Sequence, residues 1–144
     1  MKKVLFLSKE WIDIADSVLR EIVSELGEEG QKFSVSESLA NAPSEIAEKD
    51  GFVYYHILID GKSAKVCSGK LEEATLKIQA SYNSALKSAY IYYTPELIEE
   101  YTKNPPKRDY DPYEKVEGDM ASSPGYITEF HNQMVAFTLW DDCG

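Results

Sequence analysis

Residues 52–80 constrain the fold of this chain more than any other segment. Asp60 and Gly61 separate two runs rich in Val, Ile and Tyr, and this dipeptide is a strong hairpin signal because both turn residues adopt positive φ. Residues 74–80 then alternate between apolar and polar side chains, as in a half-buried antiparallel strand. The apolar phase of that run consists of Ala74, Leu76, Ile78 and Ala80. We therefore predict a three-stranded meander whose apolar face needs a cover.

An amphipathic helix near the start of the chain is the predicted cover. Ser8 is a helix-capping residue type, and the helix dipole favours Glu10 in the first turn. Apolar residues then recur at helical spacing until Gly27, where the helix is expected to end. The apolar stripe consists of Trp11, Ile14, Ala15, Val18, Leu19, Ile22 and Leu26. The opposite, polar face carries Asp13, Asp16, Ser17, Arg20, Ser24 and Glu25.

Two more strands complete the predicted sheet. Residues 33–39 alternate weakly, and their serines indicate an edge strand. Residues 115–120 predict a short fifth strand that runs into a turn. Residues 104–114, with three prolines, predict a loop. This loop either covers a pocket mouth with Tyr110 and Tyr113 or is an ordinary exposed connection.

Three further helices are predicted in the second half of the chain. Ser81 caps the first, Thr94 with Pro95 begins the second, and Pro124 opens the third. Their expected buried positions are Tyr82, Ala85, Leu86 and Ala89, then Leu97, Ile98 and Tyr101, then Ile127, Phe130, Met134 and Phe137. Together with the strands, these helices predict an α+β fold.

Length and charge limit the class of protein. The 144 residues fit one domain with a single core, in which residues 1–7 and 141–144 are expected to be tails. The formal net charge of −10 disfavours nucleic acid and anionic membrane surfaces as partners. No signal peptide is expected, and no run approaches the roughly 20 apolar residues of a membrane span. Cys67 and Cys143 show no metal or redox spacing, and a cytoplasmic location is expected.

Few residues in the sequence indicate a catalytic site. The sequence contains none of the common catalytic, zinc-binding or phosphate-binding motifs, so neither a cofactor nor a metal is expected. His56 and His131 are each isolated in the sequence, and each is expected to be a structural histidine. Asp109 and Asp111 match the start of a calcium loop, but Pro112 occupies a ligand stretch and excludes one.

Short motifs follow one another in a specific order from Ser8 to about Leu139. SKEW opens the first helix, and FVYYHILIDG with KVCSG makes up the hairpin. EATLKIQASYNSALKSA passes from the alternating strand into a helix that begins at Tyr82, and KVEGD precedes the last helix. In this order and spacing the chain resembles the sterol-carrier-protein-type family of lipid-binding proteins.

The resemblance implies a mixed, mainly antiparallel sheet of about five strands, covered on one side by helices, with an apolar tunnel between the layers. It implies a non-enzymatic carrier of fatty acids, fatty acyl chains or sterol-like lipids, without a cofactor and without stable membrane insertion. The candidate lining residues are Val53, Tyr55, Ile57, Val66, Leu76, Ile78, Leu97, Tyr101, Phe130 and Met134. For any single one of them, plain core packing is the alternative and the more common role.

Two other functions remain open at this point. Phe52, Tyr54 and Leu58 make the second face of their strand apolar, so that face can meet a partner, as in a homodimer or another structural or regulatory complex. A filled core without a pocket favours this alternative. The other is an enzyme, which requires His56 or His131 to meet an Asp or Glu in one cleft.

Overall fold

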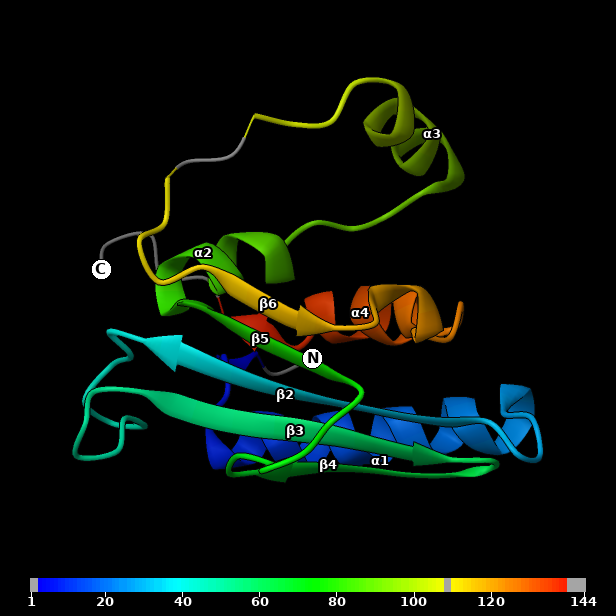
Figure 1. Cartoon of the computed structure of the whole chain (residues 1–144), viewed down its shortest axis with the longest axis horizontal. Helices are drawn as coiled ribbons and strands as arrows, with labels where there is room; N and C mark the ends of the chain where they lie inside the picture. The colour runs from blue at the N-terminus through cyan, green and yellow to red at the C-terminus, as the bar shows by residue number, and fades with distance from the viewer. Residues whose placement is uncertain (1–2, 108–109, 140–144) are drawn as a thin grey trace.

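The computed structural model describes residues 3–107 and 110–139 of the chain. A five-stranded sheet forms one layer, and α1 (Lys9–Leu26), α2 (Tyr82–Ala89) and α4 (Ile127–Val135) cover one of its faces (Figure 1). The strands of this sheet are β2 (Lys32–Ala40), β3 (Val53–Asp60), β4 (Ser63–Ser68), β5 (Leu76–Ser81) and β6 (Lys115–Gly118). Buried apolar side chains of both layers form the core. The predicted α+β fold with helices on one side of the sheet is confirmed.

The sheet is mixed, with the strand order β4-β3-β2-β5-β6. Neighbouring strands are antiparallel except for β2 and β5, which are parallel. The predicted hairpin is confirmed, but its turn consists of Gly61 and Lys62, because Asp60 pairs with Ser63 as the last residue of β3. Of the two predicted turn residues, Gly61 has a positive φ, of 61°, and Asp60 does not. The mixed, mainly antiparallel sheet implied by the resemblance is confirmed as well.

The predicted three-stranded meander is wrong, because β5 does not pair with β4. After β4 the chain crosses the outer face of the sheet and places β5 beside β2 (Figure 1). Two serines of β2 hold the crossing segment. Ser34 Oγ accepts a hydrogen bond from Thr75 N at 2.9 Å, and Ser36 Oγ accepts one from Leu71 N at 3.1 Å. The edge position predicted for residues 33–39 is also wrong, since β2 is the central strand and pairs with both β3 and β5. Its serines face the crossing segment.

The first helix has its predicted start and end, and Ser8 Oγ accepts a hydrogen bond from Trp11 N at 3.2 Å. Its buried residues are Trp11, Ile12, Ala15, Leu19, Ile22 and Val23. Leu26, which the stripe included, is 53% exposed, whereas Ile12 and Val23 are buried. The reason is that α1 packs against both β4 and α4. Its buried face is therefore rotated relative to the apolar stripe predicted from the sequence.

Asp16 on the predicted polar face of α1 is half-buried instead. One carboxylate oxygen accepts a hydrogen bond from Val66 N at 2.8 Å, and the other lies 2.9 Å from Arg20 Nε. Val66 belongs to β4, the edge strand, whose free side lacks a strand partner. Asp16 therefore satisfies a backbone donor that the sheet leaves unpaired.

The start of the chain belongs to the core. β1 (Val4–Leu5) pairs in parallel with β7 (Thr138–Leu139), and Phe6 and Leu7 are buried. The expectation of a tail over residues 1–7 is therefore wrong from Val4 onward, because these apolar side chains fill the end of the core. The tail expected over residues 141–144 lies outside the described residues.

The helix α3 (Pro95–Lys103) stands away from both layers (Figure 1). It begins at the predicted cap, since Thr94 Oγ1 accepts a hydrogen bond from Leu97 N at 3.1 Å. The burial predicted for its apolar residues is wrong, because none of its residues is buried and Ile98 is 45% exposed. Periodicity indicated an apolar stripe but not whether another element lies opposite it. We call residues 91–107 the arm.

The later elements follow the prediction more closely. The fifth strand is present as β6, followed by the short 3₁₀ helix η1 (Met120–Ser122). Tyr113 packs edge-on against Phe52, with ring centroids 6.3 Å apart, whereas Tyr110 is 90% exposed, as in an ordinary exposed connection. In α4, Phe130 and Met134 are buried as predicted.

Three further expectations concern chemistry and membranes. Cys67 on β4 is a free, half-buried cysteine, and Cys143 lies outside the described residues. Within residues 3–107 and 110–139, no group of three or more His, Cys, Asp or Glu is placed to hold a metal ion. In the same residues, no helix combines the length and the apolar character that crossing a membrane requires.

Candidate functional site

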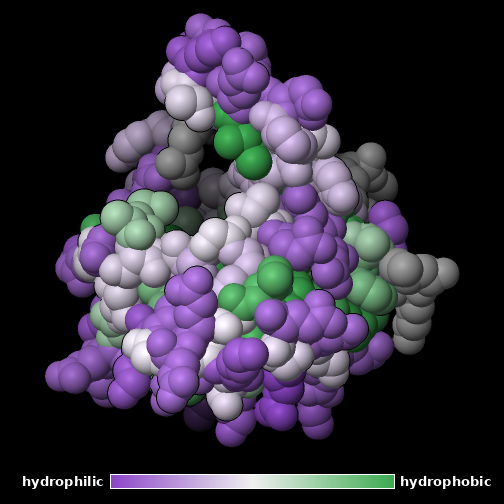
Figure 2. Space-filling view, turned by 90° about the vertical axis from the view of Figure 1, so that its right-hand side faces the viewer, coloured by the Kyte–Doolittle hydropathy of each residue, from purple (hydrophilic) through white to green (hydrophobic). Residues whose placement is uncertain are grey.

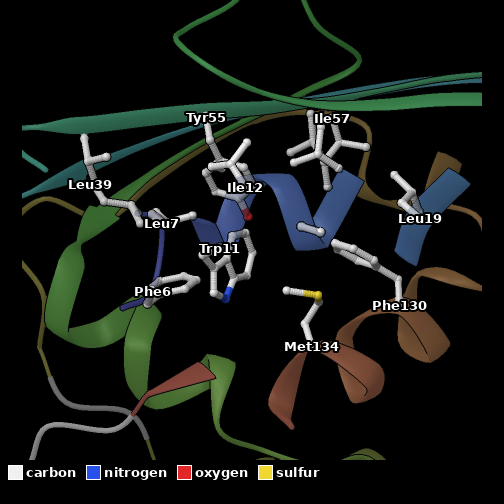
Figure 3. Packing of buried hydrophobic residues seen from close by; sticks show 14 of the residues in the cluster. Phe6, Leu7, Trp11, Ile12, Leu19, Leu39, Tyr55, Ile57, Phe130 and Met134 are labelled. Atoms are coloured by element: carbon white, nitrogen blue, oxygen red, sulfur yellow. The ribbon is translucent and has the colours of Figure 1, made fainter. Parts of the chain in front are cut away.

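A partly enclosed pocket of about 220 Å³ lies between the inner face of the sheet and the helices α2 and α4. Figure 3 shows Trp11 of α1 and Phe130 and Met134 of α4 extending into the space beneath the sheet, with Tyr55 reaching in from above. We call this space the inner pocket. Its lining consists of Phe6, Trp11, Glu37, Tyr55, Ile78, Ala80, Ser84, Ala85, Ser88, Ala89, Phe130, His131, Met134 and Thr138.

The inner pocket exists because α2 presents small side chains to it. These residues are Ser84, Ala85, Ser88 and Ala89, next to Ala80 at the end of β5. Alanine and serine reach only a short distance from the backbone, so they leave space that Leu or Phe would fill in a close-packed core. The sequence analysis took Ala85 and Ala89 only as buried positions, and their small size was the signal available for the pocket.

The structure divides the predicted lining residues into three groups. Those that line the inner pocket are Tyr55, Ile78, Phe130 and Met134. Those that lie buried in the core without lining it are Val53, Ile57, Val66 and Leu76. Leu97 and Tyr101 belong to α3 and do not line it.

Glu37 is a candidate residue that the sequence analysis missed. It lies on the central strand β2, between its register partners Tyr55 on β3 and Ile78 on β5. It shares the inner face of the sheet with the buried Val35 and Leu39. A carboxyl group in the apolar phase of a strand is costly unless it is paired, and this mismatch was visible in the sequence.

Tyr55 is the partner of Glu37, and its hydroxyl donates a hydrogen bond to Glu37 Oε2. Burial raises the pKa of Glu37 above its ordinary value of 4.5, while the hydrogen bond from Tyr55 offsets part of the rise. Burial, together with the neighbouring Glu37, also raises the pKa of Tyr55 well above its ordinary value. The surroundings therefore favour the uncharged form of both groups.

His131 lines the same pocket from α4. Its Nε2 lies 2.6 Å from the carbonyl oxygen of Ile91, which can only accept, so Nε2 donates and Nδ1 is the acceptor of the neutral ring. Burial lowers the pKa of His131 below its ordinary value of 6.5, partly offset by the hydrogen bond to Ile91. His131 therefore enters the pocket as a neutral acceptor at pH 7.

His56, in contrast, has the structural role that was expected. Its Nδ1 lies on the outer face of the sheet, 2.8 Å from the carbonyl oxygen of Gly69. Since this carbonyl accepts, the ring donates to it and fixes the start of the crossing segment. His131, in contrast, lines the same pocket as the carboxyl group of Glu37.

The other polar side chains at the end of the pocket are satisfied within the protein. Trp11 Nε1 donates to Thr138 Oγ1 at 3.0 Å, and Thr138 Oγ1 donates to the carbonyl oxygen of Met134 at 2.7 Å. No lysine or arginine of the described residues lines the pocket. The lining is therefore apolar with a few uncharged polar groups, and Glu37 is its only carboxyl group within the described residues.

The arm is attached beside this pocket. Tyr93 N donates to Asn132 Oδ1 at 2.8 Å, and Asn132 Nδ2 donates to the carbonyl oxygen of Tyr93 at 2.7 Å. Figure 2 shows open space between the arm at the top and the rest of the protein, with hydrophobic atoms on the side of the arm that borders it. The base of the arm therefore joins α4 next to His131, at the wall of the inner pocket.

Replacing Glu37 with Gln tests the buried carboxyl group through the pH dependence of stability. A raised pKa means that the folded state binds the proton more tightly than the unfolded state, so wild-type stability falls as the pH rises from 4.5 through the folded-state pKa. Gln does not titrate and still accepts from Tyr55. We expect the stability of Glu37→Gln, relative to wild type, to increase between pH 4.5 and pH 8 in urea unfolding.

The exposed Glu29→Gln provides the reference for removing one negative charge from an acidic chain. The same pH dependence in both variants would show that the effect comes from net charge. In that case Glu37 would not be protonated by burial.

Comparisons with known proteins support the fold. No protein-family model and no curated protein sequence matches the chain. Among solved structures, a conserved hypothetical protein of Thermus thermophilus, described as possibly a sterol carrier protein, has a TM-score of 0.50 and 13% identity over 100% of this chain and 97% of that chain. Sterol carrier protein domain 2 of Helicoverpa armigera has a TM-score of 0.47 and 13% identity, with 92% and 91% covered. A crystal structure of sterol carrier protein 2 has a TM-score of 0.49 and 11% identity, with 92% and 95% covered.

At these identities the likeness concerns the fold alone, and the Thermus protein carries it over the full length of the chain. The five-stranded mixed sheet and the helices on one of its faces agree with that likeness. They also agree with the motif order in the sequence. The chain therefore has a sterol-carrier-protein-2-like fold.

Proposed function

We propose that the chain is a single lipid-binding domain that holds a hydrophobic ligand, such as a fatty acyl or sterol-like lipid, as a non-enzymatic carrier. The observation that carries the proposal is the inner pocket, which lies where the sheet and helices would otherwise close into a core. Apolar side chains of Phe6, Ile78, Phe130 and Met134 contribute to its wall. A space of this kind costs packing energy when empty, and an apolar ligand recovers it.

The size of the pocket limits what enters without rearrangement. A volume of about 220 Å³ equals roughly seven water molecules at ~30 Å³ each. It lies below the range of about 300–1,000 Å³ that is common for small-molecule sites. A short alkyl chain therefore fits as the structure stands, whereas a whole acyl chain or a sterol requires the arm or the covering helices to move. Burial of eight methylenes supplies about 6 kcal/mol before the costs of association.

Filling the pocket from α2 tests this proposal. The Ala85→Phe variant places a large side chain in the lining, and the Asn83→Phe variant places the same side chain on the exposed face of the same helix. We expect 1-octanol, titrated against the fluorescence of Trp11 in the lining, to bind wild type and Asn83→Phe saturably, and Ala85→Phe at least about tenfold more weakly. Thermal melting checks that both variants fold. Equal binding by all three proteins, or no saturable binding, contradicts the proposal.

The enzyme alternative gains one observation, because His131 and Glu37 line one pocket. However, Glu37 is bonded to Tyr55 and His131 to the carbonyl oxygen of Ile91. Ser84 in the same pocket accepts a hydrogen bond from Ser81. Ser84 is also hydrogen-bonded to the carboxylate of Asp111, whose pKa is lowered below its ordinary value, so Asp111 is a weak base. Within the described residues, no serine of the pocket is hydrogen-bonded to His131 or Glu37, the two groups of the lining that could act as a base in covalent catalysis. The carrier remains the function that the site supports best.

The alternative function, an interaction domain that forms a homodimer or another complex, depended on an apolar second face of β3. Phe52 and Tyr54 stack on each other there with ring centroids 5.7 Å apart, and Tyr54 donates a hydrogen bond to Asp50. Leu58 is 39% exposed. The crossing segment covers the neighbouring part of this face at Ser34 and Ser36. The crossing segment therefore leaves only part of this face to a partner, which favours the carrier over this alternative.

A further inference from the structure

Glu37 lines the inner pocket from the middle of the sheet. Its strand is the central one of five, and its neighbours on the same face are Tyr55 and Ile78. The accessible part of Glu37 is therefore the part that lines the pocket. A ligand in the pocket meets this group and not the surrounding water.

One oxygen of Glu37 is available to a ligand. Tyr55 donates to Oε2, and no other hydrogen bond of Glu37 is formed with the described residues. In the same residues, no fully buried side-chain oxygen or nitrogen lacks a partner. The second oxygen of Glu37 is therefore open to the pocket and can bond to a molecule inside it.

The groups around Glu37 determine which charge a ligand can carry. His131 is neutral at pH 7, and Tyr55 is uncharged. No lysine or arginine of the described residues lines the pocket, so a buried carboxylate headgroup has no cationic partner and lies beside Glu37. An ammonium headgroup needs the ionised form of Glu37 as its partner, a form that burial disfavours, and an ion pair that is removed from water loses much of its attraction to desolvation.

We propose that Glu37 makes the inner pocket selective for an uncharged amphiphile with a hydroxyl head over the corresponding carboxylate or amine. A hydroxyl both donates and accepts, so it matches a protonated carboxyl group, whose free O–H donates to the ligand oxygen. The ligand hydroxyl can in turn donate to an acceptor of the lining. Burial supports this assignment, because it raises the pKa of Glu37 and favours its protonated form. The inference rests on the proposed lipid-binding function and adds the chemistry of the ligand's head.

Three probes of equal chain length test the proposal: 1-octanol, octanoate and octylamine. Each is titrated into the wild-type protein at pH 7 in a separate experiment that follows the fluorescence of Trp11 in the lining. We expect 1-octanol to bind at least about tenfold more tightly than either charged probe, because the charged heads lose their hydration without a matched partner. Octanoate or octylamine binding as tightly as 1-octanol overturns the proposal and leaves the lipid-binding function intact. Absence of saturable binding by all three probes overturns both.

Variants show whether Glu37 is the group that discriminates. In Glu37→Gln the amide offers N–H donors to a carboxylate, so we expect the preference for 1-octanol over octanoate to fall about fivefold or more. The double variant Glu37→Leu with Tyr55→Phe removes both partners together, which leaves no orphaned hydroxyl. It should bind 1-octanol about fivefold more weakly than wild type.

Glu117→Gln on the exposed β6 is the matched control and should leave the probe ratio unchanged. An unchanged ratio in Glu37→Gln would assign the selectivity to the apolar wall and overturn the role of Glu37.

Discussion

Replacing Leu19 with Ala is expected to lower the free energy of unfolding by about 3 kcal/mol or more. Leu19 is 0% exposed in the middle of α1, among the largest fully buried side chains of the described residues. Truncation removes its transfer energy and leaves a cavity between the helix and the sheet, because a close-packed core relaxes only in part. Urea unfolding followed by tryptophan fluorescence measures the change.

Leu26→Ala on the same helix is the matched control. The periodicity of the sequence places both leucines in one stripe, but Leu26 is 53% exposed. Its truncation is expected to cost less than about 1 kcal/mol. Equal losses of stability in the two variants would show that Leu26 is as buried as Leu19. In that case α1 would face the sheet with the stripe predicted from the sequence, and the orientation described above would be wrong.

The second large effect is expected for Gly118→Ala, which should lower the free energy of unfolding by about 3 kcal/mol. Gly118 ends β6 with a φ of 111°, a conformation that side chains rarely adopt. A Cβ there would also lie 2.2 Å from the carbonyl oxygen of Thr75. That carbonyl accepts a hydrogen bond from Asp119 N at 3.0 Å, so neither backbone moves freely.

Substitutions at two other glycines distinguish the backbone strain at Gly118 from the steric overlap with Thr75. Gly69 has a φ of 102° and nothing within 4 Å of a Cβ, so Gly69→Ala reports the backbone strain alone, about 1–2 kcal/mol. Gly125 has neither constraint and Gly125→Ala should be nearly neutral. Calorimetric melting of the three variants ranks them. If Gly118→Ala proves no worse than Gly69→Ala, the close approach of β6 to Thr75 is wrong.

The local elements could be predicted from sequence, because their signals lie within a few residues. Ser8 and Gly27 marked the ends of α1, and Asp60 with Gly61 marked the hairpin. The partner of β5 could not be predicted in the same way, since pairing with β2 depends on hydrogen bonds between Ser34 and Thr75, far apart in the chain. Motif order indicated the mixed sheet where alternation alone suggested a meander.

The candidate site was predictable in part for a similar reason. Large apolar residues such as Phe130 and Met134 were found because they belong to regular stripes. The pocket arises because α2 has no large side chains on the side that faces the sheet. In a sequence, small residues such as Ala85 and Ala89 cannot be distinguished from ordinary core positions of an apolar stripe. Glu37 was overlooked because the serines of residues 33–39 were taken as the sign of an exposed edge strand. The alternation of this strand nevertheless places Glu37 on the same face as Val35 and Leu39.

The central claim is that an apolar ligand enters the space between sheet and helices, and two methionines report on it directly. Met134 is 4% exposed and lines the inner pocket, whereas Met120 is 62% exposed and lies outside it. In a titration of methyl-labelled protein with 1-octanol, followed by carbon–proton NMR, we expect the Met134 methyl resonance to shift saturably while that of Met120 stays in place. Shifts at Met120 without saturation at Met134 would contradict the claim and place octanol on the protein surface.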